Sequence, residues 1–321
     1  MTRETVKVLY IAGTGRSGST ILANALGQTH GFFSAGEIGQ IWQRGMIENW
    51  LCGCGERFRD CPVWKAVIDE AFGGDGGVEP STHVGTARRI HRIRYVPRVI
   101  ASQWKPELIR SRLGESLDRL EALYRAIRSV TGCEVIVDSS KMPSYGRVLA
   151  MIPALDLSVL HLVRDPRGAA YSWQKRRLRR DGAAERYMDS MGSFKSAALW
   201  SIWNTTAELL WARDPSRYLR MRYEDVVQHP RDRLRSVIDF LGYSGVEPPF
   251  VGDNRVELGV THTISGNPSR MERGPVTLRP DLEWQREMSA RDRAVVSAIT
   301  IHSLRRYGYP WWVGNSSPST S

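Results

Sequence analysis

No stretch of the sequence approaches the roughly 20 consecutive apolar residues that a helix needs to cross a bilayer, so no membrane span is expected. The N-terminal stretch, MTRETVKVLYIAG, lacks the apolar core of a signal peptide, because its apolar run is typical of a β-strand that enters a turn. No internal repeat is present. These absences predict a soluble, cytoplasmic protein.

Acidic residues are scarce relative to basic ones. The 34 aspartates and glutamates face 45 lysines and arginines, which gives a net charge of +11. This balance favours an anionic partner, which could be a phosphorylated cofactor, a nucleic acid or a membrane surface. Residues 88–98 and 174–186 are the most basic runs, and each is interpreted either as a solvated helix face or as a rim that attracts an anion.

Residue patterns typical of metal ligands are also missing. Three of the four cysteines, Cys52, Cys54 and Cys61, lie in CGCGERFRDCPVW, and Cys133 is distant. Zinc sites favour Cys-x₂-Cys pairs or neighbouring histidines, whereas the first histidine downstream of the segment is the distant His83. We therefore assign no metal and expect a compact glycine-rich loop with small buried thiols. A disulfide or a metal knot remains the alternative.

What the sequence does contain is an alternation of strands and helices. Its 321 residues, 41% of them apolar, are enough for the core of one large domain or two small ones. Apolar runs predict strands over residues 6–12, 31–36, 134–138, 157–163 and 218–223, and helical spacing predicts helices over 115–130 and 234–241.

Such an alternation, with conspicuous turns at the carboxyl ends of strands, indicates an α/β fold. We expect a three-layer α/β/α architecture with a central parallel sheet, in a single domain over residues 1–314. Residues 40–115, rich in tryptophan and arginine, are expected to form a helical or irregular insertion that covers a binding site. Residues 315–321 are expected to form a disordered tail.

The first predicted strand is followed by GTGRSGST, a glycine-rich turn that begins a helix. Such a turn offers unpaired backbone N–H groups and the positive end of a helix dipole to an anion. The Gly-Lys-[Ser/Thr] ending of a nucleoside triphosphatase loop is missing, and Arg16 stands in its place. The loop therefore predicts a different anion, held by Gly15, Arg16, Ser17, Gly18, Ser19 and Thr20.

A second motif, LHLVRDPRGAAYSW, spans residues 160–173. Arg164 ends a strand, and Ser172 follows on the next helix, so a guanidinium and a hydroxyl can meet at one phosphate. Together the two motifs resemble the sulfotransferases that use 3′-phosphoadenosine 5′-phosphosulfate (PAPS). The resemblance implies a P-loop-like fold, in which the first loop binds the 5′-phosphosulfate and the Arg164–Ser172 pair binds the 3′-phosphate.

Further segments are similar to the bacterial branch of this family. RYEDVVQHP implies that Tyr223 lies near the adenine, and ISGNPSRMERG implies that Arg270 and Arg273 close over the 3′-phosphate. GEIGQIW and the cysteine segment also occur in that branch. The resemblance implies transfer of a sulfuryl group to a hydroxyl or amine of a small-molecule acceptor, with adenosine 3′,5′-bisphosphate as the other product. It implies least about the acceptor-binding regions, residues 40–115 and 174–200.

The reaction needs a base and groups that stabilise negative charge. Resemblance to sulfotransferases with a glutamate base favours Glu37, whose pKa a dry, partly buried site is expected to raise. Lys141 stands where cytosolic members carry a histidine, and it is predicted, with Arg16, to stabilise charge. His262 remains an alternative base, whereas His161 is interpreted as a core residue inside a strand.

Other polar and aromatic candidates are interpreted mostly as structural. Asp165 and Glu224 are expected to cap turns and helices beside the strand ends. Most of the tryptophans are expected in the core, although Trp42 follows Glu37 closely enough to be a pocket candidate.

Two other classes of function remain open at this point. A P-loop-like kinase or nucleoside triphosphatase with an arginine in its loop would need magnesium, and Asp138 is the only aspartate at a strand end that suggests a magnesium site. A basic nucleic-acid-binding protein would need exposed aromatics on a basic stripe, whereas here the arginines are scattered. The favoured interpretation, a PAPS-dependent sulfotransferase, expects no metal, because the leaving phosphate of PAPS is already a stable anion. It expects no nucleic acid, because the arginines form no stripe.

Overall fold

The computed structural model describes residues 5–90, 92–176, 178–182 and 186–311. The expected tail at residues 315–321 and parts of both basic runs lie outside the described residues.

A central sheet holds five strands, all parallel, in the order β2-β3-β1-β4-β7. Their bounds are β1 Val6–Gly13, β2 Phe32–Gly36, β3 Val135–Lys141, β4 Leu155–Val163 and β7 Tyr218–Arg222. All five predicted strands are confirmed.

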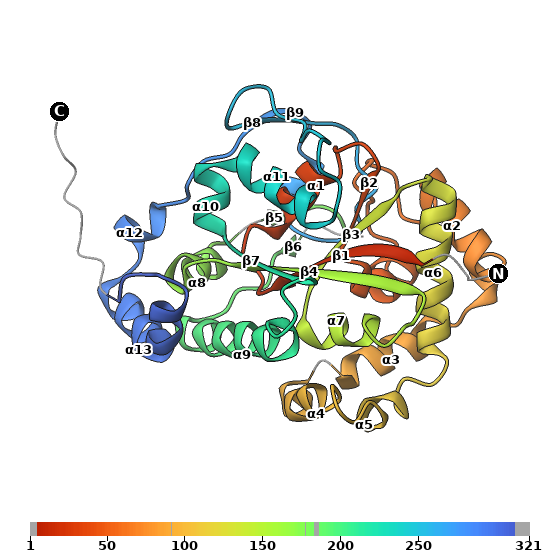
Figure 1. The fold of residues 1–321 in the computed structure, drawn as a ribbon, viewed down its shortest axis with the longest axis horizontal. Helices are drawn as coiled ribbons and strands as arrows, with labels where there is room; N and C mark the ends of the chain where they lie inside the picture. The colour runs from red at the N-terminus through yellow and green to blue at the C-terminus, as the bar shows by residue number, and fades with distance from the viewer. Residues whose placement is uncertain (1–4, 91, 177, 183–185, 312–321) are drawn as a thin grey trace.

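Helices cover both faces of the sheet. Figure 1 shows α1, α10 and α11 on one side of it and α7 and α9 on the other. Together with the strands they form the predicted three layers. The bounds of these helices are α1 Ser19–Leu26, α7 Pro143–Leu149, α9 Ser193–Trp211, α10 Tyr223–Gln228 and α11 Pro230–Phe240.

The burial of β1 explains why its sequence is an unbroken apolar run. Val8 and Tyr10 pack into the core on one face, while Leu9 and Ile11 pack into the core on the other. A parallel strand covered on both faces needs apolar side chains at successive positions, so the period of two that marks a half-exposed strand is lost.

The predicted insertion is helical rather than irregular. It contains the short helix η1 Ile38–Gln40, the π-helix η2 Ile41–Ile47, η3 Asp75–Gly77, η4 Ile93–Tyr95 and helices α2 Pro62–Phe72, α3 Pro80–Ile90, α4 Val96–Ala101 and α5 Glu107–Arg110. The helix predicted next to it, α6 Ser116–Thr131, is confirmed. Buried side chains such as Trp64 and Val99 join the insertion to the main core.

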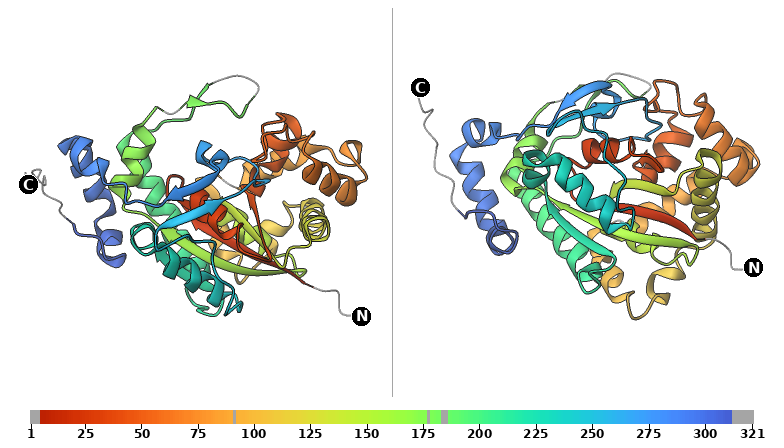
Figure 2. Two further views of the ribbon diagram at one scale, coloured as in Figure 1. Left: turned by 90° about the horizontal axis from the view of Figure 1, so that it is seen from above. Right: turned by 45° about the horizontal axis from the view of Figure 1, so that its top comes forward.

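The remaining elements lie at the other side of the molecule or over the sheet. In both views of Figure 2, α2 of the insertion (orange) lies at the side of the molecule away from α12 and α13 (blue). These elements are α8 Pro166–Gln174, α12 Glu283–Glu287, α13 Ala290–Arg306, η5 Pro268–Met271 and two small antiparallel pairs, β5 Leu178–Arg179 with β6 Arg186–Tyr187 and β8 Arg255–Leu258 with β9 Gly274–Thr277. Within the described ranges, no helix is both long and apolar enough to cross a membrane.

Candidate active site

A cleft of about 380 Å³ opens at the carboxyl ends of the parallel strands. Residues from several separate parts of the chain line it, among them the turn after β1, the turn after β2, the end of β3 and the segment before η5. They include Gly15, Arg16, Gly18, Ser19, Thr20, Glu37, Lys141, Gly266 and Asn267. The carboxyl ends of parallel strands are where α/β folds commonly bind ligands, and the fold brings most of the predicted phosphosulfate loop together there with Glu37 and Lys141.

The turn between β1 and α1 has the geometry of an anion-binding loop. Gly18 is the N-cap of α1 in a left-handed conformation, with φ of 87°. A Cβ atom there would lie 2.4 Å from the ring of Tyr223, so only glycine fits. Among the described residues, the buried Oγ of Ser17 has no hydrogen-bond partner. A buried hydroxyl without a partner at a helix N-terminus is a donor that an anion could satisfy.

Arg16 is held over the cleft by an aromatic side chain. Its guanidinium lies 4.8 Å from the ring centre of Trp173, and its Nη1 donates to the sulfur of Met188 at 3.5 Å. The backbone of Arg16 has φ of 68°, an unfavourable left-handed conformation for a residue with a side chain. Trp173 also packs against Gly15, so this ring fixes both the backbone and the cation of the loop.

Glu37 and Lys141 form an ion pair at the opposite wall of the cleft. The Nζ atom of Lys141 donates to Oε1 of Glu37 at 2.5 Å and to the carbonyl of Ser139 at 3.0 Å. Ser265 donates its hydroxyl to Oε2 of Glu37 at 3.1 Å, and Nη1 of Arg44 lies 3.6 Å from the same oxygen. Both oxygens of the Glu37 carboxylate are thus engaged by donors.

The ionisation of Glu37 differs from the sequence-based expectation. Burial raises its pKa, as predicted, but the charges of Lys141 and then Arg44 oppose this effect and hold the pKa below its usual value. The expected net increase is therefore wrong, because the sequence gives no sign that two cations converge on this carboxylate. Glu37 is ionised at neutral pH and can accept a proton.

The left-handed backbone recurs around this cleft. Among the described residues other than glycine, positive φ angles occur at Arg16, Asn49, Lys141 and Ser265. Three of these four residues line the cleft or touch Glu37. Strained backbone is maintained where the surroundings determine it, and it is concentrated at functional sites.

Arg164 and Tyr223 lie on the far side of the loop, behind Gly18. The Arg164 guanidinium lies 4.7 Å from the centre of the Tyr223 ring, and its Nη1 donates to the carbonyl of Arg16 at 2.9 Å. Its Nη2 donates to Asp281 at 2.9 Å. Burial raises the pKa of Asp281, but the Arg164 charge outweighs it and holds the pKa below its usual value. A carboxylate therefore occupies one edge of the guanidinium that is expected to bind a phosphate.

The structure does not place the other predicted cofactor residues on the cleft wall. Ser172 is buried in α8. Arg270 is buried, and its guanidinium donates to the carbonyls of Thr263 and Leu51 and to Asp181. Arg273 donates to the carbonyl of Cys54 at 2.7 Å. These contacts give both arginines structural partners in this conformation, and their contact with a cofactor stays a prediction.

Several residues interpreted as structural are confirmed as such. Asp165 accepts from the backbone N–H of Arg167 and caps α8, and Glu224 accepts from the backbone of Asp165 and from Tyr309. His161 is fully buried in β4 between Tyr218 and Asn204, and burial lowers its pKa to about 4.

Asp138, which the sequence suggested as a magnesium ligand for a kinase, is also buried, and its carboxylate accepts hydrogen bonds from neighbouring residues. The hydroxyl of Tyr124 donates to its Oδ2 at 2.5 Å, and the backbone N–H of Ser140 donates to its Oδ1 at 2.8 Å. Burial raises its pKa to about 6. Asp138 does not line the cleft.

Sequence reasoning missed several residues of the cleft. Trp173 and Ser265 lay inside quoted motifs and Arg179 inside a basic run without being assigned individual roles, and Arg44 lies outside every quoted motif. Trp42, the predicted pocket tryptophan, packs instead in the core against Phe72 and His83. The signal available for Trp173 was its place one residue after Ser172 in the second motif.

The cysteine segment also differs from the expectation drawn from spacing. His262, some 200 residues from the cysteines, lies against Cys52, Cys54 and Cys61, and all four residues can offer a ligand atom to one point. His262 is not among the residues that line the cleft, which counts against it as the base.

Comparison with known proteins agrees with this architecture. The model of the Sulfotransferase family matches residues 9–248. A sulfotransferase domain from the curacin biosynthetic pathway is 16% identical with a TM-score of 0.52, covering 96% of this chain and 100% of that one. A sulfotransferase domain from the Synechococcus PCC 7002 olefin synthase is 19% identical with a TM-score of 0.55, covering 96% of each chain. At these identities the likeness to solved structures shows the fold alone. The comparison with curated proteins gave no match.

Proposed function

Because this chain belongs to the Sulfotransferase family, we propose that it is an enzyme that transfers a sulfuryl group from PAPS to a hydroxyl or amine of a small-molecule acceptor. The observation that carries the proposal is the cleft, where an anion-binding loop faces an ionised carboxylate paired with a lysine. When bound, PAPS supplies an activated sulfuryl group on a leaving group that is a stable anion.

The residues of the loop fit a phosphosulfate. The N-terminus of α1 and the Arg16 guanidinium present donors and positive charge at the cleft. The Ser17 hydroxyl, buried in the same loop, has no hydrogen-bond partner among the described residues. A charged guanidinium and helix N-terminal N–H groups favour an anion with several oxygens. The orphaned Ser17 hydroxyl supports this fit, because a buried donor without a partner costs about 1–3 kcal/mol until something accepts from it.

Glu37 is the base in this proposal. Its carboxylate is ionised, half-buried and at the wall of the cleft, so it can accept the proton that an acceptor hydroxyl loses. Lys141 orients the carboxylate through Oε1 and places a positive charge in the cleft, where it stabilises negative charge on a leaving oxygen. Arg44 and Ser265 position Glu37 from its other oxygen.

The acceptor is proposed to carry an apolar body. Beyond Lys141 the cleft is lined by the apolar side chains Met142, Met188, Met191, Leu199 and Trp203. Apolar and aromatic side chains with a few polar groups are typical of sites for small organic molecules. An acceptor hydroxyl on such a body could reach Glu37, whereas a strongly charged acceptor would lose its hydration against this wall.

Calorimetry with adenosine 3′,5′-bisphosphate, 5′-AMP and ATP with magnesium tests the donor. We expect the bisphosphate to bind at least about 10-fold more tightly than AMP, because Arg164 contributes a charge-assisted hydrogen bond to the 3′-phosphate. Arg164→Ala should remove most of this preference, while the control Arg231→Ala, which removes an exposed positive charge on α11, should keep it. Equal affinity for bisphosphate and AMP, or a preference for magnesium ATP, would overturn the assignment.

Turnover with labelled PAPS and a panel of alcohols, phenols and amines tests the transfer itself. Products that gain one sulfuryl group by mass spectrometry identify the acceptor class. Transfer to charged sugars in preference to apolar alcohols would contradict the proposed acceptor while leaving the donor intact.

A further inference from the structure

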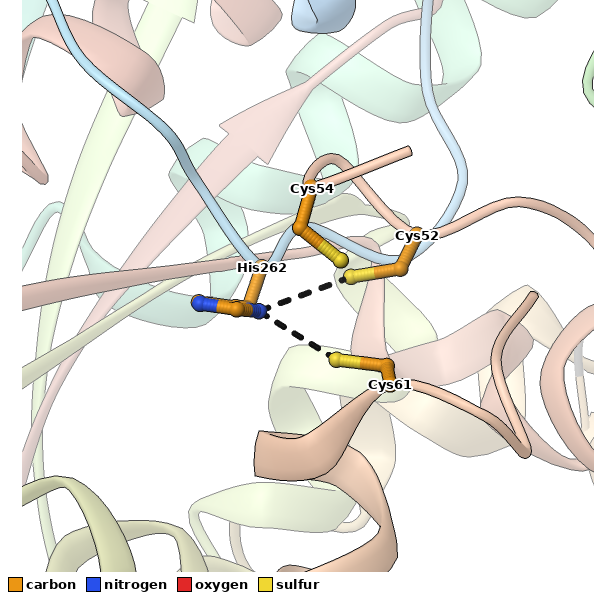
Figure 3. A group of neighbouring side chains, drawn as sticks. All are labelled: Cys52, Cys54, Cys61 and His262. Atoms are coloured by element: carbon orange, nitrogen blue, oxygen red, sulfur yellow. Dashed lines mark hydrogen bonds between the residues drawn. The ribbon is translucent and has the colours of Figure 1, made fainter. Parts of the chain in front are cut away.

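Three thiols and one imidazole converge at a point outside the cleft. The ligand atoms of Cys52, Cys54, Cys61 and His262 all lie within 4.8 Å of one another. Nδ1 of His262 lies 3.2 Å from Sγ of Cys61 and 3.9 Å from Sγ of Cys52. Figure 3 shows the sulfurs of Cys52 and Cys54, from one loop, and of Cys61, from the start of α2, gathered near Nδ1 of His262, which belongs to a separate loop.

The backbone holds these side chains together by contacts of its own. The N–H of Gly53 donates to the carbonyl of Thr263 at 3.0 Å, and the indole of Trp64 donates to the carbonyl of His262 at 2.7 Å. A Cβ atom at position 53 would lie 2.4 Å from Oγ1 of Thr261, so glycine between the two cysteines allows the loop to approach the histidine segment. The arrangement is therefore part of the fold and not a chance meeting of long side chains.

Cys61 is buried in the main core at the start of α2. It is the N-cap residue of α2, where serine, threonine or aspartate normally accepts a backbone hydrogen bond, yet its side chain makes no such bond. The thiol points instead to His262. Within the described part of the chain all four cysteines are free thiols, and three of them belong to this cluster.

We propose that Cys52, Cys54, Cys61 and His262 bind one Zn²⁺ ion in a closed Cys₃His site. Tetrahedral Zn–S bonds of about 2.3 Å separate the sulfurs by about 3.8 Å, so a cluster within 4.8 Å needs a contraction of about 1 Å or less. As each Zn–S bond forms, the thiol releases its proton to solvent, and neutral His262 binds through Nδ1. The Arg273 guanidinium, which donates to the Cys54 carbonyl, lies beside the site and offsets its negative charge.

The site has a structural role, because four protein ligands leave no open position. None of its ligands lines the cleft. It nevertheless joins the insertion to the segment that supports Glu37: Ile264 accepts from the backbone N–H of Glu37 at 2.8 Å, and Ser265 donates to its carboxylate. Zinc would therefore fix the 261–266 segment on one side of the cleft. This inference does not rest on the proposed transfer reaction.

Metal content of the full chain tests the site. The chain is produced in zinc-supplemented medium and purified without chelator, and zinc, iron, nickel and copper are measured by plasma mass spectrometry. We expect about one zinc per chain, as one closed site requires. Cys61→Ser and His262→Asn should lose most of this zinc. The controls Cys133→Ser, a buried thiol remote from the cluster, and His302→Asn, an exposed imidazole on α13, should retain it.

A measurement on the unaltered chain decides the question if the variants fail to fold. Mercurial modification of the thiols should release zinc in step with the loss of thiols, and a cobalt-substituted chain should show the thiolate-to-metal charge-transfer absorption of a tetrahedral site. Chelated, metal-free chain should also unfold at a lower temperature than the zinc form.

Three results would overturn the proposal. The first is a chain free of zinc that shows no charge-transfer absorption with cobalt. The second is a disulfide between two of these cysteines in freshly purified chain, detected by mass spectrometry of unreduced peptides. The third is stoichiometric iron in place of zinc.

Discussion

At the scale of single residues, the proposed chemistry depends on Glu37 being an ionised base at neutral pH. Glu37→Gln keeps the size of the side chain and one of its two acceptor oxygens, so it can still accept from either Lys141 or Ser265, but it removes the group that accepts a proton. We expect turnover to fall by about 10²–10⁴-fold, the usual range for removal of a general base. Steady-state rates at saturating PAPS, compared with those of the unaltered chain, measure the effect.

Two controls separate this role from a structural one. Bisphosphate affinity of Glu37→Gln should stay within a few-fold of the unaltered chain, and Glu70→Gln, an exposed position on α2, should change neither quantity. If Glu37→Gln turns over within a few-fold of the unaltered chain while His262→Asn is inactive despite being folded, the base is not Glu37.

Lys141 sets the pH range in which Glu37 can act. Burial raises the Glu37 pKa, and the charges of Lys141 and Arg44 lower it further than burial raises it. The acid limb of kcat/KM should therefore lie below the ordinary glutamate pKa in the unaltered chain. Lys141→Met removes the larger of the two opposing charges, so the acid limb should move to higher pH. Lys141→Arg should move it less, and an unmoved limb in Lys141→Met would show that another group titrates.

The same pair links pH to stability. A carboxyl group with a lowered folded-state pKa contributes stability above its unfolded pKa and loses it as pH falls through the folded value. Unfolding temperature of the unaltered chain should therefore drop at acidic pH by more than that of Glu37→Gln, which has no such carboxylate. Thermal unfolding followed at neutral and acidic pH, with Glu70→Gln as the control, checks the difference.

At the scale of elements, the strands were predictable, whereas the individual helices of the insertion were not. A parallel strand buried on both faces, such as β1, must be an unbroken apolar run, and this signal is local. The short helices of the insertion are set by packing against the main core, through side chains such as Trp64 and Val99. Such tertiary control leaves little trace in the local pattern of residues.

The residues of the candidate site also fall into two groups, those that the sequence could predict and those that it could not. The loop after β1, Glu37 and Lys141 follow predicted strands, so the topology of a parallel sheet brings them together. Ser265 and His262 come from a segment distant in sequence that reaches the site only after the chain has folded over it. Spacing along the chain could not reveal these partners.

The turn before α8 and the segment before α12 meet through Arg164 and Asp281. If the guanidinium binds the 3′-phosphate, the carboxylate competes with that phosphate for the Nη2 edge. Asp281→Asn should therefore tighten bisphosphate binding by a few-fold and leave AMP binding unchanged. Calorimetry with both ligands measures this, and weaker bisphosphate binding in Asp281→Asn would show instead that Asp281 positions Arg164.

At the scale of the whole molecule, the net charge of +11 could not choose among anionic partners. The structure places arginines and a lysine from separate elements around one cleft, namely Arg16, Arg44, Lys141 and Arg179. These four positive side chains exceed the two carboxylates of the same cleft, Glu37 and Asp189. A concave site with such an excess of positive charge concentrates small anions. This distribution favours a small anionic ligand over an extended strand of nucleic acid.

Salt dependence distinguishes a small ligand in the cleft from a nucleic acid spread over the surface. Raising the ionic strength from about 0.05 to 0.2 M weakens nucleic acid bound through many phosphates by several powers of ten. Bisphosphate held by a few enclosed groups should weaken far less, because charges excluded from solvent are poorly screened. We expect bisphosphate to bind throughout this range and single-stranded DNA to bind, if at all, only at its lower end.

Calorimetry at both salt concentrations, with the DNA also offered as a competitor, gives the comparison. DNA that binds at the higher salt and displaces bisphosphate would show that the cleft belongs to a nucleic-acid surface, and the small-anion assignment would be wrong.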